Sequence, residues 1–238
     1  MRLTDFRALS FDCYGTLIDW ETGLSAALAP LSRRAGIAVD DRMLAAFGAH
    51  ESRVQDDHPD WLYPAILGEV HRRLAAQWGV ARDEAEEAAF ASSVGDWPAF
   101  PDTPAALSYL KGHFRLIILS NIDRVSFARS NLRLGVEFDH VFTAEEIGTY
   151  KPDPRNFEYL VGRLAGEGIE KKEILHVAQS LFHDHVPANR IGLASAWIDR
   201  RSGTGGGATP EPEAGVRYDF RFETLEQLAE AHRRERKG

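Results

Sequence analysis

The stretch that decides the fold is Phe11-Asp12-Cys13-Tyr14-Gly15-Thr16-Leu17, which continues the short apolar run Ala8–Phe11. A short apolar run of this kind is typical of a buried strand in a parallel sheet. The glycine that follows the carboxylate predicts a tight turn, whose backbone N–H groups can hold Asp12 and aim it at a substrate. The stretch therefore predicts a reactive carboxylate at the end of a first strand.

Further apolar runs recur along the chain with helix-length segments between them. They cover residues 116–119, 140–142, 175–178 and 194–198. This alternation predicts an α/β fold with a doubly wound parallel sheet. Residues 218–222 alternate like an edge strand, residues 225–232 predict a closing helix, and residues 202–215, rich in Gly, Pro and Glu, predict a surface loop.

A helical insertion is expected directly after the first strand, because about a hundred residues separate the first two apolar runs. Within it, two faces repeat at helical spacing: Leu24, Leu28 and Leu31, then Ile66, Val70, Leu74 and Trp78. Gly36 and Gly79 are placed as helix stops, and Trp97-Pro98 marks the return to the core. We predict a core domain of residues 1–18 and 98–238 and a helical cap domain of residues 19–97.

The composition is that of a folded soluble protein, with 44% hydrophobic and 27% charged residues among 238. A formal net charge of −8 disfavours nucleic-acid binding, which needs clustered Lys and Arg. No apolar run is long enough to span a membrane, and no secretion signal is recognisable, so a cytoplasmic location is expected. The one cysteine, Cys13, excludes an internal disulfide and a thiolate zinc cluster, and it is expected to be a small buried side chain.

Polar residues follow each of the first four strands, and the carboxyl ends of parallel strands meet at one edge of a sheet. After Asp12 and Thr16 come Ser120 and Asn121, then Lys151, and finally Gln179, Ser180 and Asp184. Lys151 is expected to keep Asp12 ionised, and Asp184 to orient that lysine. Thr16 and Ser120 offer hydroxyls to a carboxylate, and Asn121 offers amide donors to an anion.

Each of these residues also has an ordinary structural interpretation. An Asp after a strand is often a turn residue, a Ser-Asn pair commonly caps a helix, and Lys151 could be solvated. Four strand-end signals in this order favour the functional interpretation, which is a catalytic site around Asp12.

Together these motifs resemble the haloacid dehalogenase superfamily: Phe11 to Leu17, Leu119-Ser120-Asn121, Lys151-Pro152 and residues 177–193. The resemblance covers essentially the whole chain and implies a Rossmann-like core with a helical cap inserted after the first strand. Most members are magnesium-dependent phosphatases, in which a second Asp stands at the position of Tyr14 and a metal-binding Asp at that of Gln179. These two changes remove an acid and an oxygen ligand, and halide leaves without a proton.

The resemblance to the type II 2-haloacid dehalogenases, which also carry a tyrosine at the Tyr14 position, therefore implies a metal-independent hydrolase of carbon–halide bonds without a cofactor. A short 2-haloalkanoic acid would become a 2-hydroxy acid through an ester on Asp12. The implied catalytic residues are Asp12, Lys151, Asp184 and Thr16, with Asp184 orienting the water and backbone N–H groups near Tyr14 and Gly15 stabilising the oxyanion. Tyr14, Ser120, Asn121, Gln179 and Ser180 would bind substrate, Ser120 its carboxylate and Asn121 the halide.

The cap departs from this pattern, because no arginine aligns with the halide-binding arginine of these enzymes. Arg53 is a weak candidate, and it could equally be solvated on its helix. His183 and His185 flank Asp184, but residues two apart on a helix point in different directions, which disfavours a metal site. A magnesium-dependent phosphatase using Asp12 and Asp184, and a non-catalytic carboxylate-binding protein, stay open as alternatives. The expected partner is a small halogenated carboxylic acid, and a homodimer through the cap is a further expectation.

Overall fold

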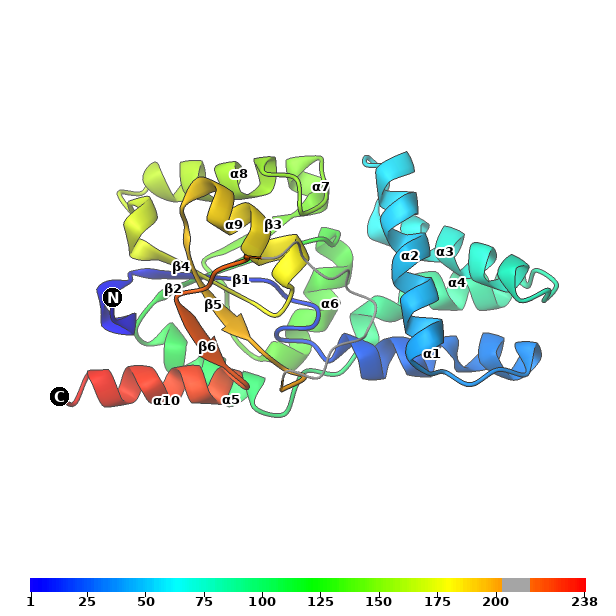
Figure 1. Cartoon of the computed structure of the whole chain (residues 1–238), viewed down its shortest axis with the longest axis horizontal. Coiled ribbons are helices and arrows are strands. Elements are labelled where there is room, and N and C mark those ends of the chain that lie inside the picture. The colour runs from blue at the N-terminus through cyan, green and yellow to red at the C-terminus, as the bar shows by residue number, and fades with distance from the viewer. Residues whose placement is uncertain (203–214) are drawn as a thin grey trace.

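The fold is built on a six-stranded parallel sheet with the order β3-β2-β1-β4-β5-β6 (Figure 1). The structure is a computed structural model that describes residues 1–202 and 215–238. Its strands are β1 (Ala8–Phe11), β2 (Arg115–Ser120), β3 (His140–Thr143), β4 (Ile174–Ala178), β5 (Ala194–Ile198) and β6 (Phe220–Phe222). The predicted doubly wound sheet is confirmed, while most of the predicted loop 202–215 lies outside the described residues.

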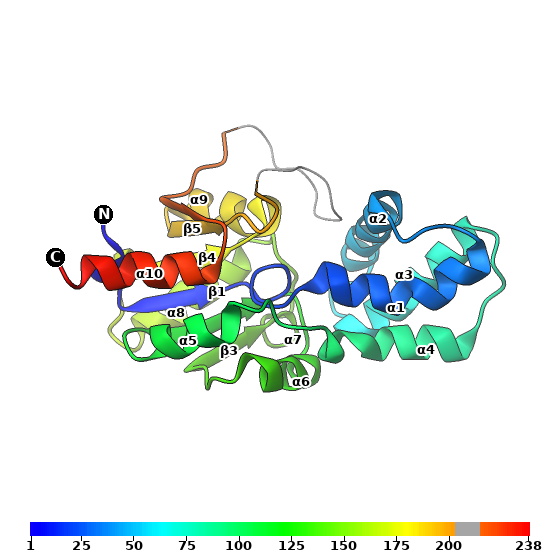
Figure 2. The same ribbon diagram turned by 90° about the horizontal axis from the view of Figure 1, so that it is seen from below.

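Helices cover both faces of the sheet, as Figures 1 and 2 show. On one face lie α5 (Thr103–Lys111), α6 (Arg124–Leu134) and α10 (Leu225–Glu235), and on the other α8 (Arg155–Ala165) and α9 (Val186–Ile191), with the one-turn α7 (Ala144–Ile147) before α8. Side chains alternate between the faces of a strand, so Leu116 and Ile118 pack in one apolar core and Ile117 and Leu119 in the other. Burial on both faces explains why these strands are continuous apolar runs.

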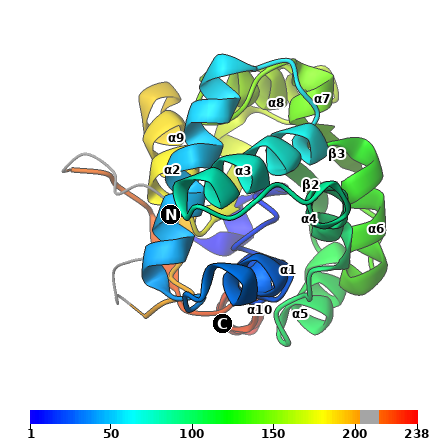
Figure 3. The ribbon, with the colours of Figure 1, turned by 90° about the vertical axis from the view of Figure 1, so that its right-hand side faces the viewer.

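The helical insert between β1 and α5 consists of α1 (Trp20–Ala35), α2 (Asp41–Asp57), α3 (Tyr63–Gln77) and α4 (Glu84–Ser92). Figures 1 and 2 show it at the end of the molecule remote from both termini, and in Figure 3 it faces the viewer. The predicted helix faces are buried, except that Trp78 is half-buried. Gly36 ends α1 in the left-handed region, with a φ of 67°, as its position in the sequence predicts. No helix among the described residues is long and apolar enough to cross a membrane.

Two adjacent chain segments connect the insert to the core. Ile18 forms an antiparallel bridge with Ala99, the Asp19 N–H donates to Pro98 O at 2.8 Å, and the Phe100 N–H donates to Leu17 O at 3.0 Å. The chain therefore enters and leaves the insert at neighbouring points.

Arg200, after β5, braces these connections from the core side. Its guanidinium donates to Thr16 O at 2.8 Å and to Asp102 Oδ1 at 2.7 Å, and it lies 4.0 Å from the centre of the Phe100 ring. Asp102 Oδ2 in turn accepts from the Leu225 N–H at 2.8 Å, at the start of α10. The last helix is thereby tied to the loop that follows β1.

Candidate active site

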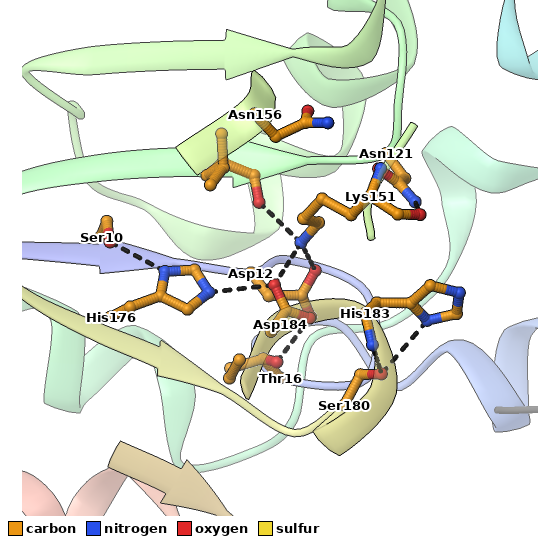
Figure 4. Close-up of polar contacts among 12 residues, drawn as sticks. Ser10, Asp12, Thr16, Asn121, Lys151, Asn156, His176, Ser180, His183 and Asp184 are labelled. Atoms are coloured by element: carbon orange, nitrogen blue, oxygen red, sulfur yellow. Dashed lines mark hydrogen bonds and ion pairs between the residues drawn. The ribbon is translucent and has the colours of Figure 1, made fainter. Parts of the chain in front are cut away.

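A buried lysine joins two carboxylates at the carboxyl ends of β1 and β4, where the strand order reverses (Figure 4). Lys151 Nζ donates to Asp12 Oδ1 at 2.9 Å, to Asp184 Oδ1 at 2.6 Å and to Leu119 O at 2.9 Å. Asp12 follows β1, and Asp184 lies in η4 (Leu181–His185), a π-helical turn after β4. The three side chains that the sequence analysis placed at one edge of the sheet are thus in direct contact.

The loop after β1 fixes the second oxygen of Asp12. Thr16 Oγ1 donates to Asp12 Oδ2 at 2.6 Å, and it accepts from the Gln179 N–H at 2.9 Å. Gly15 makes this turn with a φ of 96°, and a Cβ there would lie 3.0 Å from Trp20 Nε1 and 3.3 Å from Gln179 Oε1. The glycine that the sequence placed in a tight turn is therefore required by both its conformation and its close neighbours.

Burial and the neighbouring opposite charges shift the pKa values of these side chains in opposite directions. Burial lowers the pKa of Lys151, but the carboxylates of Asp12 and Asp184 outweigh it and raise that pKa above its usual value. Burial also raises the pKa of Asp184, but Lys151 and His176 hold it well below its usual range. For Asp12, burial raises the pKa, and Lys151 offsets this only in part. The cluster thus separates a firmly ionised carboxylate, Asp184, from one that is easier to neutralise, Asp12.

His176 lies in the middle of β4 and is completely buried, and it joins the site although no strand-end pattern in the sequence indicates it. Its Nε2 lies 2.9 Å from Asp184 Oδ1 and its Nδ1 2.8 Å from Ser10 Oγ, on the neighbouring strand β1 (Figure 4). Asp184 Oδ1 is therefore held from two sides, while its Oδ2 is buried without a hydrogen-bond partner among the described residues. The sequence feature that could have indicated this contact is the presence of polar residues, Ser10 and His176, inside otherwise apolar strands.

A cavity of about 80 Å³ lies between this cluster and the insert. Asp12, Ser120, Lys151, Gln179 and Ser180 line it from the core. From the insert and its return come Trp20, Glu51, Ser52, Gln55, Tyr63 and Trp97, none of which the sequence analysis named as a site residue. The volume holds a few water molecules and suits a small substrate.

The remaining predicted binding residues also line this cavity, although their hydrogen bonds are structural. The Asn121 amide accepts from the Lys151 N–H at 2.6 Å and donates to Lys151 O at 3.0 Å. Ser180 Oγ caps η4 by accepting from the His183 N–H at 3.0 Å. The Tyr14 hydroxyl lies 2.8 Å from Ser130 Oγ, and its ring packs edge-on against Trp97. Asn121 thus positions the lysine, and Tyr14 supports the wall of the cavity.

Glu51 is the acidic group that the insert contributes to the cavity. The Tyr63 hydroxyl donates to Glu51 Oε1 at 2.5 Å. Burial raises the pKa of Glu51 to about 7, and the hydrogen bond from Tyr63 opposes this shift. Near neutral pH this carboxyl therefore exists in both protonation states.

Other polar residues highlighted in the sequence lie away from the reactive cluster or have structural partners. Arg53 is exposed and does not line the cavity. His185 is buried, with Nδ1 2.9 Å from Ser195 Oγ and Nε2 3.1 Å from Ala178 O. Cys13 is buried, as expected.

The oxygen donors at the strand ends include two carboxylates and an amide. Asp12 and Asp184 both pair with Lys151, and Gln179 contributes its amide to the same cavity. Within residues 1–202 and 215–238, no group of three or more His, Cys, Asp or Glu side chains is arranged to hold a metal ion.

A parallel sheet with a helical insert over the carboxyl ends of its strands, and a charged cluster between the two, defines a capped α/β protein. The chain belongs to the haloacid dehalogenase-like hydrolases, whose family model matches residues 6–179. It is 25% identical over 220 residues to an (S)-2-haloacid dehalogenase of Pseudomonas putida, covering 85% of this chain and 91% of that relative.

Two crystal structures of L-2-haloacid dehalogenases share the fold. One, PA0810, is 25% identical with a TM-score of 0.74, and the match covers 94% of this chain and 98% of that one. The other, the defluorinating Rha0230, is 22% identical with a TM-score of 0.79, covering 98% and 99%. The resemblance predicted from the motifs is confirmed at the level of the superfamily.

Proposed function

We propose that this protein hydrolyses the carbon–halogen bond of a short 2-haloalkanoic acid to the 2-hydroxy acid, with Asp12 as the nucleophile and without a metal ion. The observation that carries the proposal is the state of Asp12: its two oxygens are held by Lys151 and Thr16 beside a small cavity. Tyr14 and Gln179, where the phosphatases of the superfamily place carboxylates, support halide as the leaving group. The similarity to 2-haloacid dehalogenases supports the same substrate class.

In the first step, a carboxylate oxygen of Asp12 attacks the carbon that bears the halogen. The new carbon–oxygen bond forms an ester as the halide leaves with the bonding electron pair, and the configuration at that carbon is inverted. Lys151 and Thr16 keep the attacking carboxylate in one orientation. Halide departs as an anion, so this step needs no general acid.

In the second step, water attacks the carbonyl carbon of the Asp12 ester. Asp184, whose Oδ2 has no hydrogen-bond partner among the described residues, orients this water, and one proton of the water passes to the departing alkoxide oxygen. Release of the second water proton regenerates the Asp12 carboxylate. The Gly15 N–H already donates to Ile18 O at 2.8 Å, so the Tyr14 N–H is the remaining oxyanion donor of the pair expected from the sequence.

The test is halide release from 2-chloropropionate in the presence of a chelator. Asp12→Asn should lower the rate at least about a thousandfold, because the amide is a poor nucleophile. Asp60→Asn, on the exposed surface of the insert, is the matched control and should keep full activity. A single turnover in heavy-oxygen water should place the label in the Asp12 side chain, and undiminished activity of Asp12→Asn would contradict the mechanism.

The same assay distinguishes the alternatives left by the sequence. Magnesium-dependent hydrolysis of an aryl phosphate without halide release would identify a phosphatase, and carboxylate binding without turnover would identify a non-catalytic protein. The division into a core domain of residues 1–18 and 98–238 and a cap domain of residues 19–97, and a homodimer, stay predictions.

A further inference from the structure

Among the described residues, no Lys, Arg or His of the insert lines the cavity. Lys151, its buried lysine, is already paired with Asp12 and Asp184. The groups that the insert contributes are the neutral side chains of Trp20, Ser52, Gln55 and Tyr63, the carboxyl of Glu51, and Trp97 at its return. Among the described residues, the hydrogen-bond donors that the insert can offer a substrate carboxylate are therefore these neutral side chains and Glu51 when it is protonated.

Glu51 becomes such a donor when it carries a proton. Glu51 lines the cavity, and Tyr63 donates to its Oε1, so Oε2 is the oxygen that would carry the proton. Burial disfavours the ionised form of Glu51, and no described cation acts to lower its pKa. An anionic ligand nearby would favour the protonated form still more.

We propose that Glu51, in its protonated form, donates a hydrogen bond to the carboxylate of the substrate and makes the site selective for small carboxylates. This inference rests on the proposed function for its substrate, but it concerns binding and can be tested without turnover. The arginine sought in the cap was expected to bind halide, so Glu51 adds a contact to the substrate carboxylate, for which the sequence suggested Ser120, and does not replace that arginine.

Other titratable groups face the same cavity or its walls. From α3 comes Tyr63 itself, and from the core come Asp12, Tyr14, Tyr150, Lys151, His183 and Asp184. Burial raises the pKa values of the three tyrosines and lowers that of His183 to about 4, so these four stay neutral between pH 6 and 8.5. Lys151 and Asp184 stay charged. Asp12, whose pKa is also raised, is the group that an experiment must separate from Glu51.

The probe is propionate, which lacks a halogen and cannot react. Since only the protonated form of Glu51 binds it, affinity should fall about tenfold for each pH unit above 7. Binding at pH 7 should also take up about half a proton, because Glu51 has a pKa of about 7 in the free protein. Titration calorimetry from pH 6 to 8.5, in two buffers of different ionisation enthalpy, measures both quantities.

Three variants test whether the proton taken up on propionate binding is bound by Glu51. Glu51→Gln keeps a donor that does not titrate, so propionate binding should become independent of pH and proton uptake should vanish. Tyr63→Phe removes the hydrogen bond that lowers the pKa of Glu51, and should move the midpoint of the pH dependence upward. Asp12→Asn should leave the proton uptake in place.

Three results would overturn the inference: no propionate binding at pH 6, proton uptake that survives in Glu51→Gln, or tighter binding by Glu51→Gln at every pH, which would reveal repulsion by an ionised Glu51. Failure of the proposed function looks different. In that case 2-chloropropionate binds with the same pH dependence as propionate, and no halide is released.

Discussion

At the scale of single residues, Lys151 is the group on which the active-site charges depend. Its ammonium group pairs with two buried carboxylates, and the lysine side chain is only 1% exposed. We expect Lys151→Met to lower the free energy of unfolding by about 3–5 kcal/mol, because Asp12 and Asp184 would be left buried without a cation. Urea denaturation at pH 7 measures the loss.

The matched control is Lys111→Met. Lys111 pairs with Asp139 at 2.7 Å, but the two side chains are 33% and 21% exposed. This partly solvated pair should cost about 1 kcal/mol or less. Equal losses in the two lysine variants would show that burial of the Lys151 cluster carries no special cost.

Glu51 and His176 show what the sequence leaves open at this scale. Asp12, Thr16, Lys151 and Asp184 could be predicted because each follows a strand, and strand ends converge. The contact of His176 with Ser10 depends on the register between β4 and β1, which are far apart in the chain. The position of Glu51 depends on how α2 packs over the core, and no local pattern encodes that packing.

At the scale of elements, the contact between α1 and the returning chain depends on a glycine. A Cβ on Gly23 would lie 2.2 Å from Trp97 Cγ, so Gly23→Ala must displace a ring that lines the cavity and packs against Tyr14. We expect a loss of about 1–3 kcal/mol in the free energy of unfolding and a higher KM for 2-chloropropionate.

Gly162→Ala in α8 is the control for this substitution. Nothing lies within 4 Å of a Cβ at Gly162, so alanine there should stabilise the helix by about 0.5–1 kcal/mol without changing KM. Thermal unfolding and steady-state kinetics of both variants check the pair. Equal stability changes in the two glycine variants would contradict the packing argument.

The turn η4 makes the fold sensitive to acid through His185. Burial lowers its pKa to about 4, whereas an unfolded histidine titrates near 6.5. Between these values the unfolded chain binds more protons, so stability falls as the pH drops from 6.5 to 4. We expect His185 to account for about 2–3 kcal/mol of loss between pH 7 and 4.5.

Urea denaturation of wild type and His185→Gln at pH 8, 7 and 4.5 tests this assignment. The difference in unfolding free energy between the two proteins should stay constant from pH 8 to 7 and shrink at pH 4.5. Parallel stability curves over the whole range would place the acid sensitivity elsewhere.

The strands show why the elements themselves could be predicted. Each central strand is buried on both faces, and this makes the runs 116–119, 175–178 and 194–198 visible without an alignment. The structure extends β2 to Arg115–Ser120, because hydrogen bonding continues past the apolar core at both ends. The π-helical geometry of η4 carries no such signal, since its residues also fit an ordinary helical turn.

At the scale of the whole molecule, Arg200 connects the last helix, the chain returning from the insert and the loop after β1. Its side chain is 7% exposed and that of Asp102 14%. Arg200→Met should destabilise the protein by about 3–5 kcal/mol, because Asp102 loses its cation while largely buried. It should also slow turnover, because Thr16 loses the donor to its backbone oxygen.

Arg2→Met is a suitable comparison, because Arg2 also pairs with an aspartate, Asp5, but the two side chains are 71% and 43% exposed. Chemical denaturation and halide-release kinetics of the two arginine variants separate the effects. Normal turnover in a destabilised Arg200→Met protein would show that the brace supports the fold but does not position the loop of Asp12.

The adjacent connections at Ile18 and Ala99 also affect how such a protein can evolve. Since the chain leaves the core and returns to it at neighbouring points, a single contiguous segment can be lost, lengthened or exchanged without moving β1 or α5. The residues that hold Asp12 all belong to the unchanged part, while Glu51 and Tyr63 belong to the exchangeable one. One ancestral core could in this way acquire new substrates by exchanging the insert while Asp12 and its hydrogen-bond partners stay in place.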